Sequence, residues 1–183
     1  MANFDLSFDR LMKLEFSSPK NALHKNKGES GYTFMGIYES ANPKWSGWEQ
    51  IKNTLLLYPL EYASEVLYSD RELKEQAKDF YKKQYWDKAK LDFVLPFDIA
   101  NLIFIFGVNV GMKTAIKYAQ QIVKVENDGI VGKITLRALN GYSPLRFVSE
   151  YKQLQIKYYT QLAHLKPNYK IFLNGWLNRV KNS

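Results

Sequence analysis

Hydrophobic residues recur along most of this chain at helical spacing, three or four positions apart, which predicts amphipathic helices. In the first of these, Phe8, Leu11 and Met12 share one face, and Glu15 continues their apolar stripe just before a polar loop. An acid in that position is expected where the interior meets a cleft. Partial desolvation and the negative end of the helix dipole both favour its protonated form, as a general acid requires. A rim glutamate that leans into solvent is the alternative.

A polar, aperiodic stretch follows, residues 16–32, and is predicted to be a long loop of the kind that often lines a binding site. Glu29 lies in this loop, and Thr33 and Gly36 come after it. Short polar residues separated by glycines favour a tight turn or a small β-hairpin whose backbone approaches a ligand. A plain surface turn explains them equally well.

The middle of the chain combines a helix-start signal with the most apolar segment. Ser69 and Glu72 have the spacing of a capping box, which predicts a helix that begins there and runs to about Tyr85. Residues 97–108 are apolar on nearly every side, which predicts a central, buried helix. Pro96 suits the first turn of that helix.

The C-terminal part repeats the helical pattern. Further helices are predicted over residues 112–123, up to Asn140-Gly141, over residues 143–165 and over a last segment carrying Phe172, Trp176, Leu177 and Val180. Between them, Gly129 and Gly132 are both suited to positive φ in a turn. Ser143 is the expected N-cap of the long helix. The apolar positions of that helix are Leu145, Val148, Leu154, Tyr158 and Leu162.

These elements define the expected fold class. It is all-α, a helical bundle of two closely packed lobes, and it admits one small β-hairpin near residues 32–38. The lobes are expected to comprise residues 4–95 and 96–181 and to share one core. Neither a repeat nor a flexible linker divides the sequence.

Composition narrows the possible chemistry. The chain has 183 residues, 46% of them hydrophobic and 15% aromatic, so it is expected to fold around a substantial core. The absence of cysteine excludes disulfides, thiolate metal sites and a cysteine nucleophile. His24 and His164 are far apart in sequence, which leaves little for a histidine metal site or a catalytic triad. Carboxylates are therefore the expected catalytic groups, with neither metal nor cofactor.

The charge indicates the kind of partner. Lysine and arginine number 26 against 18 acidic residues, a formal charge of +8 that favours anionic surfaces. The basic residues are scattered, and no motif of a nucleic-acid-binding fold is recognisable. We expect a general attraction to an anionic surface and no specific nucleic-acid recognition.

Neither a membrane span nor a signal peptide is expected. The most apolar stretch, residues 91–110, is interrupted by Pro96, Asp98 and Asn101, whereas a spanning helix needs about 20 mainly apolar residues. The N-terminus lacks a basic segment followed by an apolar one. Synthesis in the cytoplasm is therefore expected.

Several stretches, taken in order, resemble glycoside hydrolase family 108, the lysozyme-like muramidases found among phage endolysins and bacterial secretion-activator proteins. These proteins carry an attached peptidoglycan-binding region. The matching stretches are Glu15, Thr33-Phe34-Met35-Gly36-Ile37, Tyr85-Trp86-Asp87, Phe97-Asp98, Asn109-Val110-Gly111, Gln120, Asp128-Gly129-Ile130-Val131-Gly132, Thr135-Leu136 and Gly175-Trp176-Leu177-Asn178-Arg179-Val180. One departure is clear, because Glu15-Phe16-Ser17 replaces the family's Glu-Gly-Gly and residues 18–30 replace its Asp-Pro-rich loop.

The resemblance implies cleavage of the β-1,4 bond between N-acetylmuramic acid and N-acetylglucosamine. Glu15 would protonate the leaving oxygen as an oxocarbenium-like transition state forms. A second carboxylate stays open, with Glu29 as the first candidate and Asp98 as the second. A single-acid mechanism with water placed by Thr33 also fits.

The resemblance also implies a binding surface for peptidoglycan glycan strands. Tyr85, Trp86 and Asn109 would line the glycan groove, and Asp98 and Gln120 complete the expected substrate-binding set. Core packing and helix capping are the alternative roles of the first three. In this scheme the lobe 4–95 is catalytic and the lobe 96–181 binds peptidoglycan.

Two further functions compete with the hydrolase. The altered loop allows a non-catalytic peptidoglycan-binding protein of the same fold, and the charge of +8 allows a basic nucleic-acid-binding protein. For the hydrolase, we expect a monomer that acts on the cell wall in the periplasm. A holin or a secretion system would release it.

Overall fold

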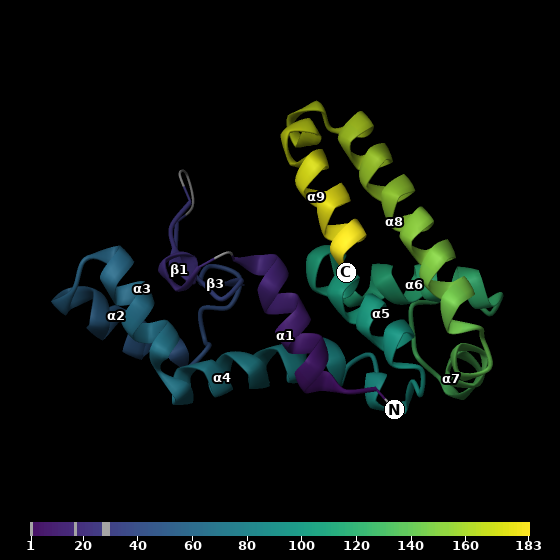
Figure 1. Cartoon of the computed structure of the whole chain (residues 1–183), viewed down its shortest axis with the longest axis horizontal. Helices are drawn as coiled ribbons and strands as arrows, with labels where there is room; N and C mark the ends of the chain where they lie inside the picture. Colours follow the sequence, from purple (N-terminus) through teal and green to yellow (C-terminus); the bar gives the residue numbers. More distant parts are fainter. Residues whose placement is uncertain (1, 17, 27–29) are drawn as a thin grey trace. The chain divides into compact units, whose positions relative to one another are not determined.

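The computed structural model describes residues 2–16, 18–26 and 30–183. Its α-helices and small antiparallel sheet confirm the predicted all-α, lysozyme-like class (Figure 1). The helices are α1 (Phe4–Glu15), α2 (Gly47–Leu57), α3 (Leu60–Ser69), α4 (Arg71–Tyr81), α5 (Phe97–Val110), α6 (Met112–Val123), α7 (Lys133–Asn140), α8 (Pro144–Leu165) and α9 (Lys170–Asn182). The strands are β1 (Leu23–His24), β2 (Thr33–Phe34) and β3 (Ile37–Tyr38), and short non-α turns cover Pro19–Asn21, Lys82–Trp86, Leu91–Phe93 and Pro167–Tyr169.

The chain forms two compact units. The smaller unit spans residues 11–82, and the larger unit combines residues 1–10 with residues 83–183. The sequence predicts a catalytic role for residues 4–95 and a binding role for residues 96–181. That division by function stays a prediction. None of the helices in the described ranges is long and apolar enough to cross a membrane.

The small sheet belongs to the smaller unit. Antiparallel pairing joins β2 to both of its neighbours, through the pairs Leu23–Phe34, His24–Thr33, Thr33–Tyr38 and Phe34–Ile37. Met35 and Gly36 form the two-residue turn between β2 and β3, with φ of 48° and 82°, and two positive values in succession characterise a type I′ hairpin. The hairpin predicted near residues 32–38 is confirmed. The pairing of β1, within a segment predicted as loop, was not expected.

Helix α3 supports this sheet. The buried hydroxyl of Ser64 accepts a hydrogen bond from the Leu23 N–H at 2.9 Å and donates one to the Pro19 carbonyl at 2.6 Å. The Met35 N–H donates to the Ala22 carbonyl at 2.7 Å. The Ser64 hydroxyl therefore ties the Pro19 turn and β1 to α3. The backbone bond between Met35 and Ala22 holds the hairpin turn beside the start of β1.

The capping box predicted at Ser69 was wrong by one residue. Ser69 is instead the last residue of α3, a helix that the sequence analysis did not predict. The Ser69 hydroxyl donates to the Glu65 carbonyl. Asp70 is the N-cap of α4, because its Oδ1 accepts from the Leu73 N–H at 2.9 Å. An aspartate caps a helix as well as a serine does, so adjacent Ser and Asp left the start ambiguous.

The core of the larger unit surrounds α5. All residues from Ile99 to Gly107 are buried, which confirms the prediction of a central helix. Phe106 meets four tyrosine rings at centroid distances of 5.7–5.8 Å. They are Tyr118 of α6 and Tyr151, Tyr158 and Tyr159 of α8.

Two details of the C-terminal helices differ from the sequence prediction. The buried face of α8 consists of Phe147, Tyr151, Gln155, Tyr159 and Ala163, whereas Leu145 is 86% exposed. Gly129 has the expected positive φ of 79°, but Gly132 has φ −98° and extends the chain into α7. The predicted N-cap is confirmed, because Ser143 accepts from the Arg146 N–H.

Candidate functional site

Glu15 lines a pocket at the end of α1. The side chain is half-buried, and the pocket has a volume of about 360 Å³. Lys13, Leu14, Phe16, Asn21 and His24 are the other lining residues. The last turn of α1, the turn that follows it and β1 therefore bring one glutamate, one lysine and one histidine to the same pocket.

The hairpin turn lies against the carboxyl of Glu15. A Cβ atom built on Gly36 would come within 3.3 Å of Glu15 Oε2 and within 2.4 Å of the Tyr81 hydroxyl. That hydroxyl donates a hydrogen bond to the Met35 carbonyl at 2.8 Å. Glycine at position 36 is thus required twice, by its positive φ and by the lack of room for a side chain.

Thr33 lies on β2, where it is 8% exposed. The sheet register places it directly opposite His24 of β1. Directly paired residues of antiparallel strands project to the same face of a sheet, with Cβ atoms about 4.5–5.5 Å apart. The predicted water-positioning threonine therefore neighbours a residue of the Glu15 pocket.

The two candidates for a second carboxylate differ in what can be said of them. Glu29 lies outside the described residues. Asp98 is in the first turn of α5 in the larger unit, where its exposed carboxylate is 4.0 Å from the Arg10 guanidinium. Arg10 also lies over the ring of Phe97. The role of either acid in catalysis stays a prediction.

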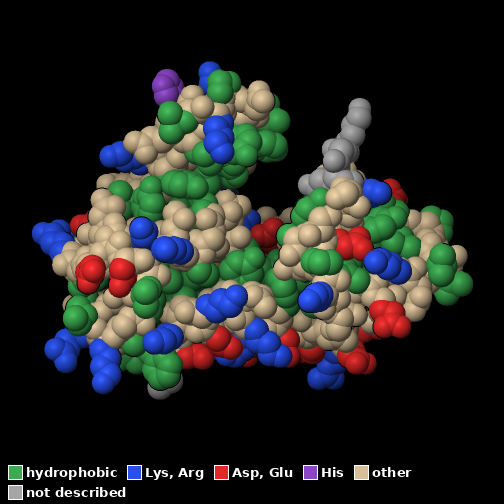
Figure 2. Space-filling view, turned by 180° about the vertical axis from the view of Figure 1, so that it is seen from behind, with side chains coloured by type: hydrophobic (Ala, Val, Ile, Leu, Met, Phe, Trp, Pro, Cys, Tyr) green, Lys and Arg blue, Asp and Glu red, His purple; other side chains and the backbone are tan. Residues whose placement is uncertain are grey.

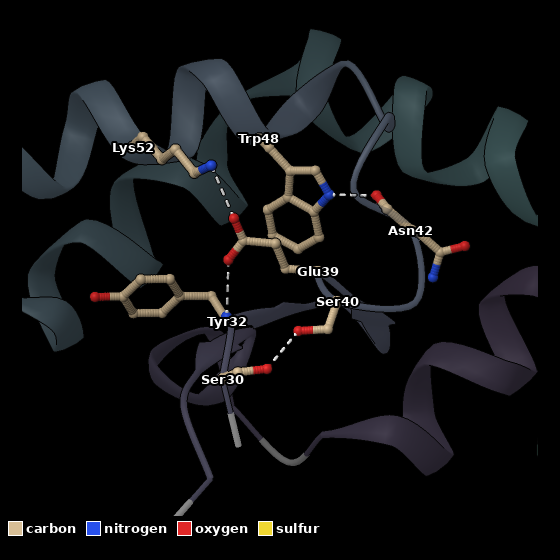
Figure 3. Close-up of polar contacts among 7 residues, drawn as sticks. All are labelled: Ser30, Tyr32, Glu39, Ser40, Asn42, Trp48 and Lys52. Atoms are coloured by element: carbon tan, nitrogen blue, oxygen red, sulfur yellow. Dashed lines mark hydrogen bonds and ion pairs between the residues drawn. The ribbon is translucent and has the colours of Figure 1, made fainter. Parts of the chain in front are cut away.

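An acid that the sequence did not single out, Glu39, anchors the hairpin to α2 (Figure 3). Its carboxylate meets Lys52 Nζ at 2.8 Å and accepts from the Tyr32 N–H at 3.1 Å. The Lys52 ammonium and, to a smaller extent, the Tyr32 N–H lower the pKa of Glu39 from its ordinary value of 4.5. Because both of its oxygens accept from donors that favour the ionised form, the Glu39 carboxylate is suited to a structural role and not to donating a proton.

We predict that Glu39→Gln destabilises the protein in a pH-dependent way. Because folding lowers the pKa of Glu39, its contribution is present above the unfolded value and is lost as the pH falls through the folded value. At pH 7 the loss should be about 1 kcal/mol, or roughly 2–4 °C in melting temperature. Thermal denaturation at pH 7 and pH 3 measures it.

Lys52→Gln provides the matched control for this prediction. It should cost a similar amount at pH 7, and the double variant should cost less than the sum, because both changes remove one interaction. An equal loss from Glu39→Gln at both pH values would contradict the ionic origin.

Trp86, predicted to line the glycan groove, is a core residue of the larger unit. Its ring is fully buried and packs edge-on against Phe4 and Phe104 at 5.4 and 5.5 Å. The indole N–H donates to Asp92 at 2.7 Å. No ring face is open for a sugar, so core packing describes this residue. Tyr85, its neighbour, is half-exposed.

The remaining predicted binding residues support local structure. Asn109 is exposed at the end of α5 and accepts from the Tyr159 hydroxyl at 2.7 Å. Gln120 is buried and binds the turn that follows α6, where its Oε1 accepts from the Gly129 N–H at 2.8 Å. Its amide nitrogen donates to Asp128, Ile130 and Thr135. Folding of this turn accounts for a glutamine at that position.

The larger unit has a second pocket, between α6 and α8. Its volume is about 290 Å³, and Gln121, Ile122, Lys124, Tyr142, Arg146, Glu150, Gln153 and Leu154 line it. Glu150 accepts from Arg146 Nε at 2.7 Å and from the Tyr142 hydroxyl at 2.8 Å. Both bonds lower the pKa of Glu150, and the bond from Arg146 has the larger effect. The pocket therefore presents fixed charges of both signs.

One face of the molecule shows how the charged side chains of the described residues are distributed. On the face shown in Figure 2, lysine and arginine side chains are spread among acidic ones. Within the described ranges, no three His, Cys, Asp or Glu side chains converge as a metal site would require.

Two protein families and a solved structure are similar to this chain. Residues 21–111 match the family described as Glycosyl hydrolase 108, and residues 114–181 match the one described as Predicted Peptidoglycan domain. The structure of Brucella abortus SagA is similar over 97% of this chain and 89% of that chain, with a TM-score of 0.69 and 23% identity. That likeness shows the fold alone. No curated protein matches.

Glu15 precedes the first residue matched to the hydrolase family, and its hairpin and pocket partners His24, Thr33 and Gly36 fall within the match. The two matched regions together span most of the chain. The chain belongs to glycosyl hydrolase family 108 and carries a C-terminal peptidoglycan-domain region, so it is a glycoside hydrolase of the peptidoglycan-hydrolase type.

Proposed function

We propose that the protein is an N-acetylmuramidase, which cleaves the β-1,4 bond between N-acetylmuramic acid and N-acetylglucosamine. Glu15 is the general acid. The observation that carries this proposal is the position of Glu15, whose carboxyl lines a pocket and lies against the Gly36 turn of the hairpin. A general acid must be within reach of the leaving oxygen while the protein holds its orientation.

In this mechanism the glycan strand enters the pocket with its scissile oxygen at the carboxyl of Glu15. The proton moves from Glu15 to that oxygen as the C1–O bond breaks, and positive charge develops on the sugar ring. The turn at Gly36 lies against that carboxyl, and Tyr81 holds the turn through its hydrogen bond to the Met35 carbonyl. Thr33 lies on the adjoining strand, from which it would position water.

The larger unit is proposed to bind the wall. Its peptidoglycan-domain region includes the second pocket, where Lys124 and Arg146 offer cations beside the ionised Glu150. Such a surface suits the carboxylates and amides of a wall peptide. The net charge of +8 adds a general attraction to an anionic envelope. The proposed place of action is the wall, reached through a holin or a secretion system.

Mass analysis of products tests the reaction. The protein is incubated with purified peptidoglycan, and the soluble fragments are reduced and identified. Fragments that end in reduced muramic acid support the proposal. Reduced glucosamine ends indicate a glucosaminidase, anhydro-muramic ends a transglycosylase, and free stem peptides an amidase, and each of these products rejects it.

A non-catalytic wall-binding protein is the second candidate. It is favoured by the departure from the family pattern, because Glu15-Phe16-Ser17 stands in place of Glu-Gly-Gly and residues 18–30 stand in place of the Asp-Pro-rich loop. Sedimentation with insoluble peptidoglycan, run beside a turbidity assay, separates the two functions. Binding without clearing supports this candidate, and clearing rejects it.

A further inference from the structure

We propose that His24 is a second catalytic residue, the general base that activates water in the Glu15 pocket. This inference rests on the proposed muramidase function and concerns the same site. His24 lies on β1, half-exposed, and lines the pocket together with Glu15. Its strand partner is Thr33, so the imidazole and the threonine hydroxyl project from the same face of the sheet.

The hydrogen bonding of His24 leaves it able to accept a proton. Its Nδ1 is 3.1 Å from the backbone carbonyl of Asn21. A carbonyl oxygen only accepts hydrogen bonds, so in the neutral ring Nδ1 carries the proton and Nε2 keeps its lone pair. A ring held at one nitrogen by a backbone carbonyl, with the other nitrogen as acceptor, has the arrangement of a histidine base.

The pocket needs such a group. Among the described residues that line it, Glu15 is the one carboxylate, and it is already assigned to protonating the leaving group. Lys13 is a cation with donors only. Glu39, the nearby acid of the hairpin, is held by Lys52 and by the Tyr32 N–H. Of these groups His24 is the one whose neutral side chain offers a nitrogen lone pair to a proton from water.

The proposed step balances as a single displacement. A water oxygen bonds to the anomeric carbon while one of its protons moves to His24 Nε2. At the same time Glu15 gives its proton to the glycosidic oxygen, and the bond between that oxygen and the anomeric carbon breaks. The products are a hemiacetal of inverted configuration, an imidazolium and a carboxylate. Proton exchange with solvent restores both groups for the next turnover.

Two variants test the base. His24→Asn keeps a side-chain N–H near the position of Nδ1 but removes the basic nitrogen, and His24→Ala opens space for a small anion. Each is expected to lower the rate of muropeptide release about 100-fold or more, with a melting temperature close to that of the wild type. His164→Ala is the control, because His164 is the other histidine of the chain and lies exposed near the end of α8 in the larger unit.

Azide rescue separates a base from a merely structural residue. Azide attacks the anomeric carbon without needing deprotonation, so it should restore bond cleavage by His24→Ala and yield a glycosyl azide detectable by mass analysis. It should not rescue Glu15→Gln, which lacks the proton for the leaving group. Nuclear magnetic resonance of fresh wild-type product should show the inverted anomer.

The possible failures are distinct. Near wild-type rates in both folded His24 variants, or a retained anomer from the wild type, overturn the role of His24 and leave the muramidase intact. A wild-type protein that releases no muropeptides overturns the proposed function and this inference together.

Discussion

Glu15→Gln is expected to reduce glycan cleavage by about 100- to 10,000-fold, the usual contribution of a general acid. Glutamine keeps the size of the side chain and its hydrogen-bonding atoms but has no proton to give. Because the side chain is half-buried in the wall of a pocket, the melting temperature should change little. Clearing of purified peptidoglycan and release of reducing ends measure the activity, and circular dichroism measures the melting temperature.

Glu61→Gln is a suitable control for that experiment. Glu61 is exposed in the first turn of α3, so removing its charge makes the same chemical change away from the pocket. Its activity should match that of the wild type. Clearing by Glu15→Gln at the wild-type rate would assign the proton to another group and remove the main support for the proposed mechanism.

Trp86→Ala is expected to lower the free energy of unfolding by about 3–5 kcal/mol, or roughly 6–20 °C in melting temperature. The change removes a fully buried indole that contacts Phe4 and Phe104. It also leaves Asp92 without the N–H donor that it has at 2.7 Å. At a temperature where the variant is folded, KM for peptidoglycan fragments should equal that of the wild type.

Trp86→Phe divides this effect into two parts. Phenylalanine retains an aromatic ring for packing and loses the hydrogen bond to Asp92, so its melting temperature should lie between those of wild type and Trp86→Ala. A raised KM with an unchanged melting temperature in either variant would place the ring in the glycan groove and contradict the burial argument.

The sequence predicted the helices whose apolar positions form regular stripes. Helix α6 has the predicted ends, and α5 and α7 differ little from expectation. Helix α3 was missed because the apolar residues around its start do not mark a buried face. Leu56 and Leu57 are 83% and 73% exposed. Because apolar residues there are not buried, their spacing does not indicate the buried face of a helix.

The site was predictable only in part. The stripe in α1 led to Glu15, since burial and helix spacing are local properties. The pairing of His24 with Thr33 and the ion pair between Glu39 and Lys52 depend on the register of two-residue strands. Strands that short have too few positions for alternation to fix their register. For Trp86 and Gln120, the folding contacts supply a reason for the motif residues besides ligand binding, because core packing and turn formation also restrict residue choice.

Phe106 limits how such proteins can be recombined. It belongs to the hydrolase-matched segment, residues 21–111, while the four tyrosines around it belong to the peptidoglycan-matched segment, residues 114–181. The peptidoglycan-matched segment, excised at the boundary between the two, would lose the aromatic ring that its four tyrosines surround. Chimaeric proteins built from this chain should therefore transfer α5 together with everything that follows it.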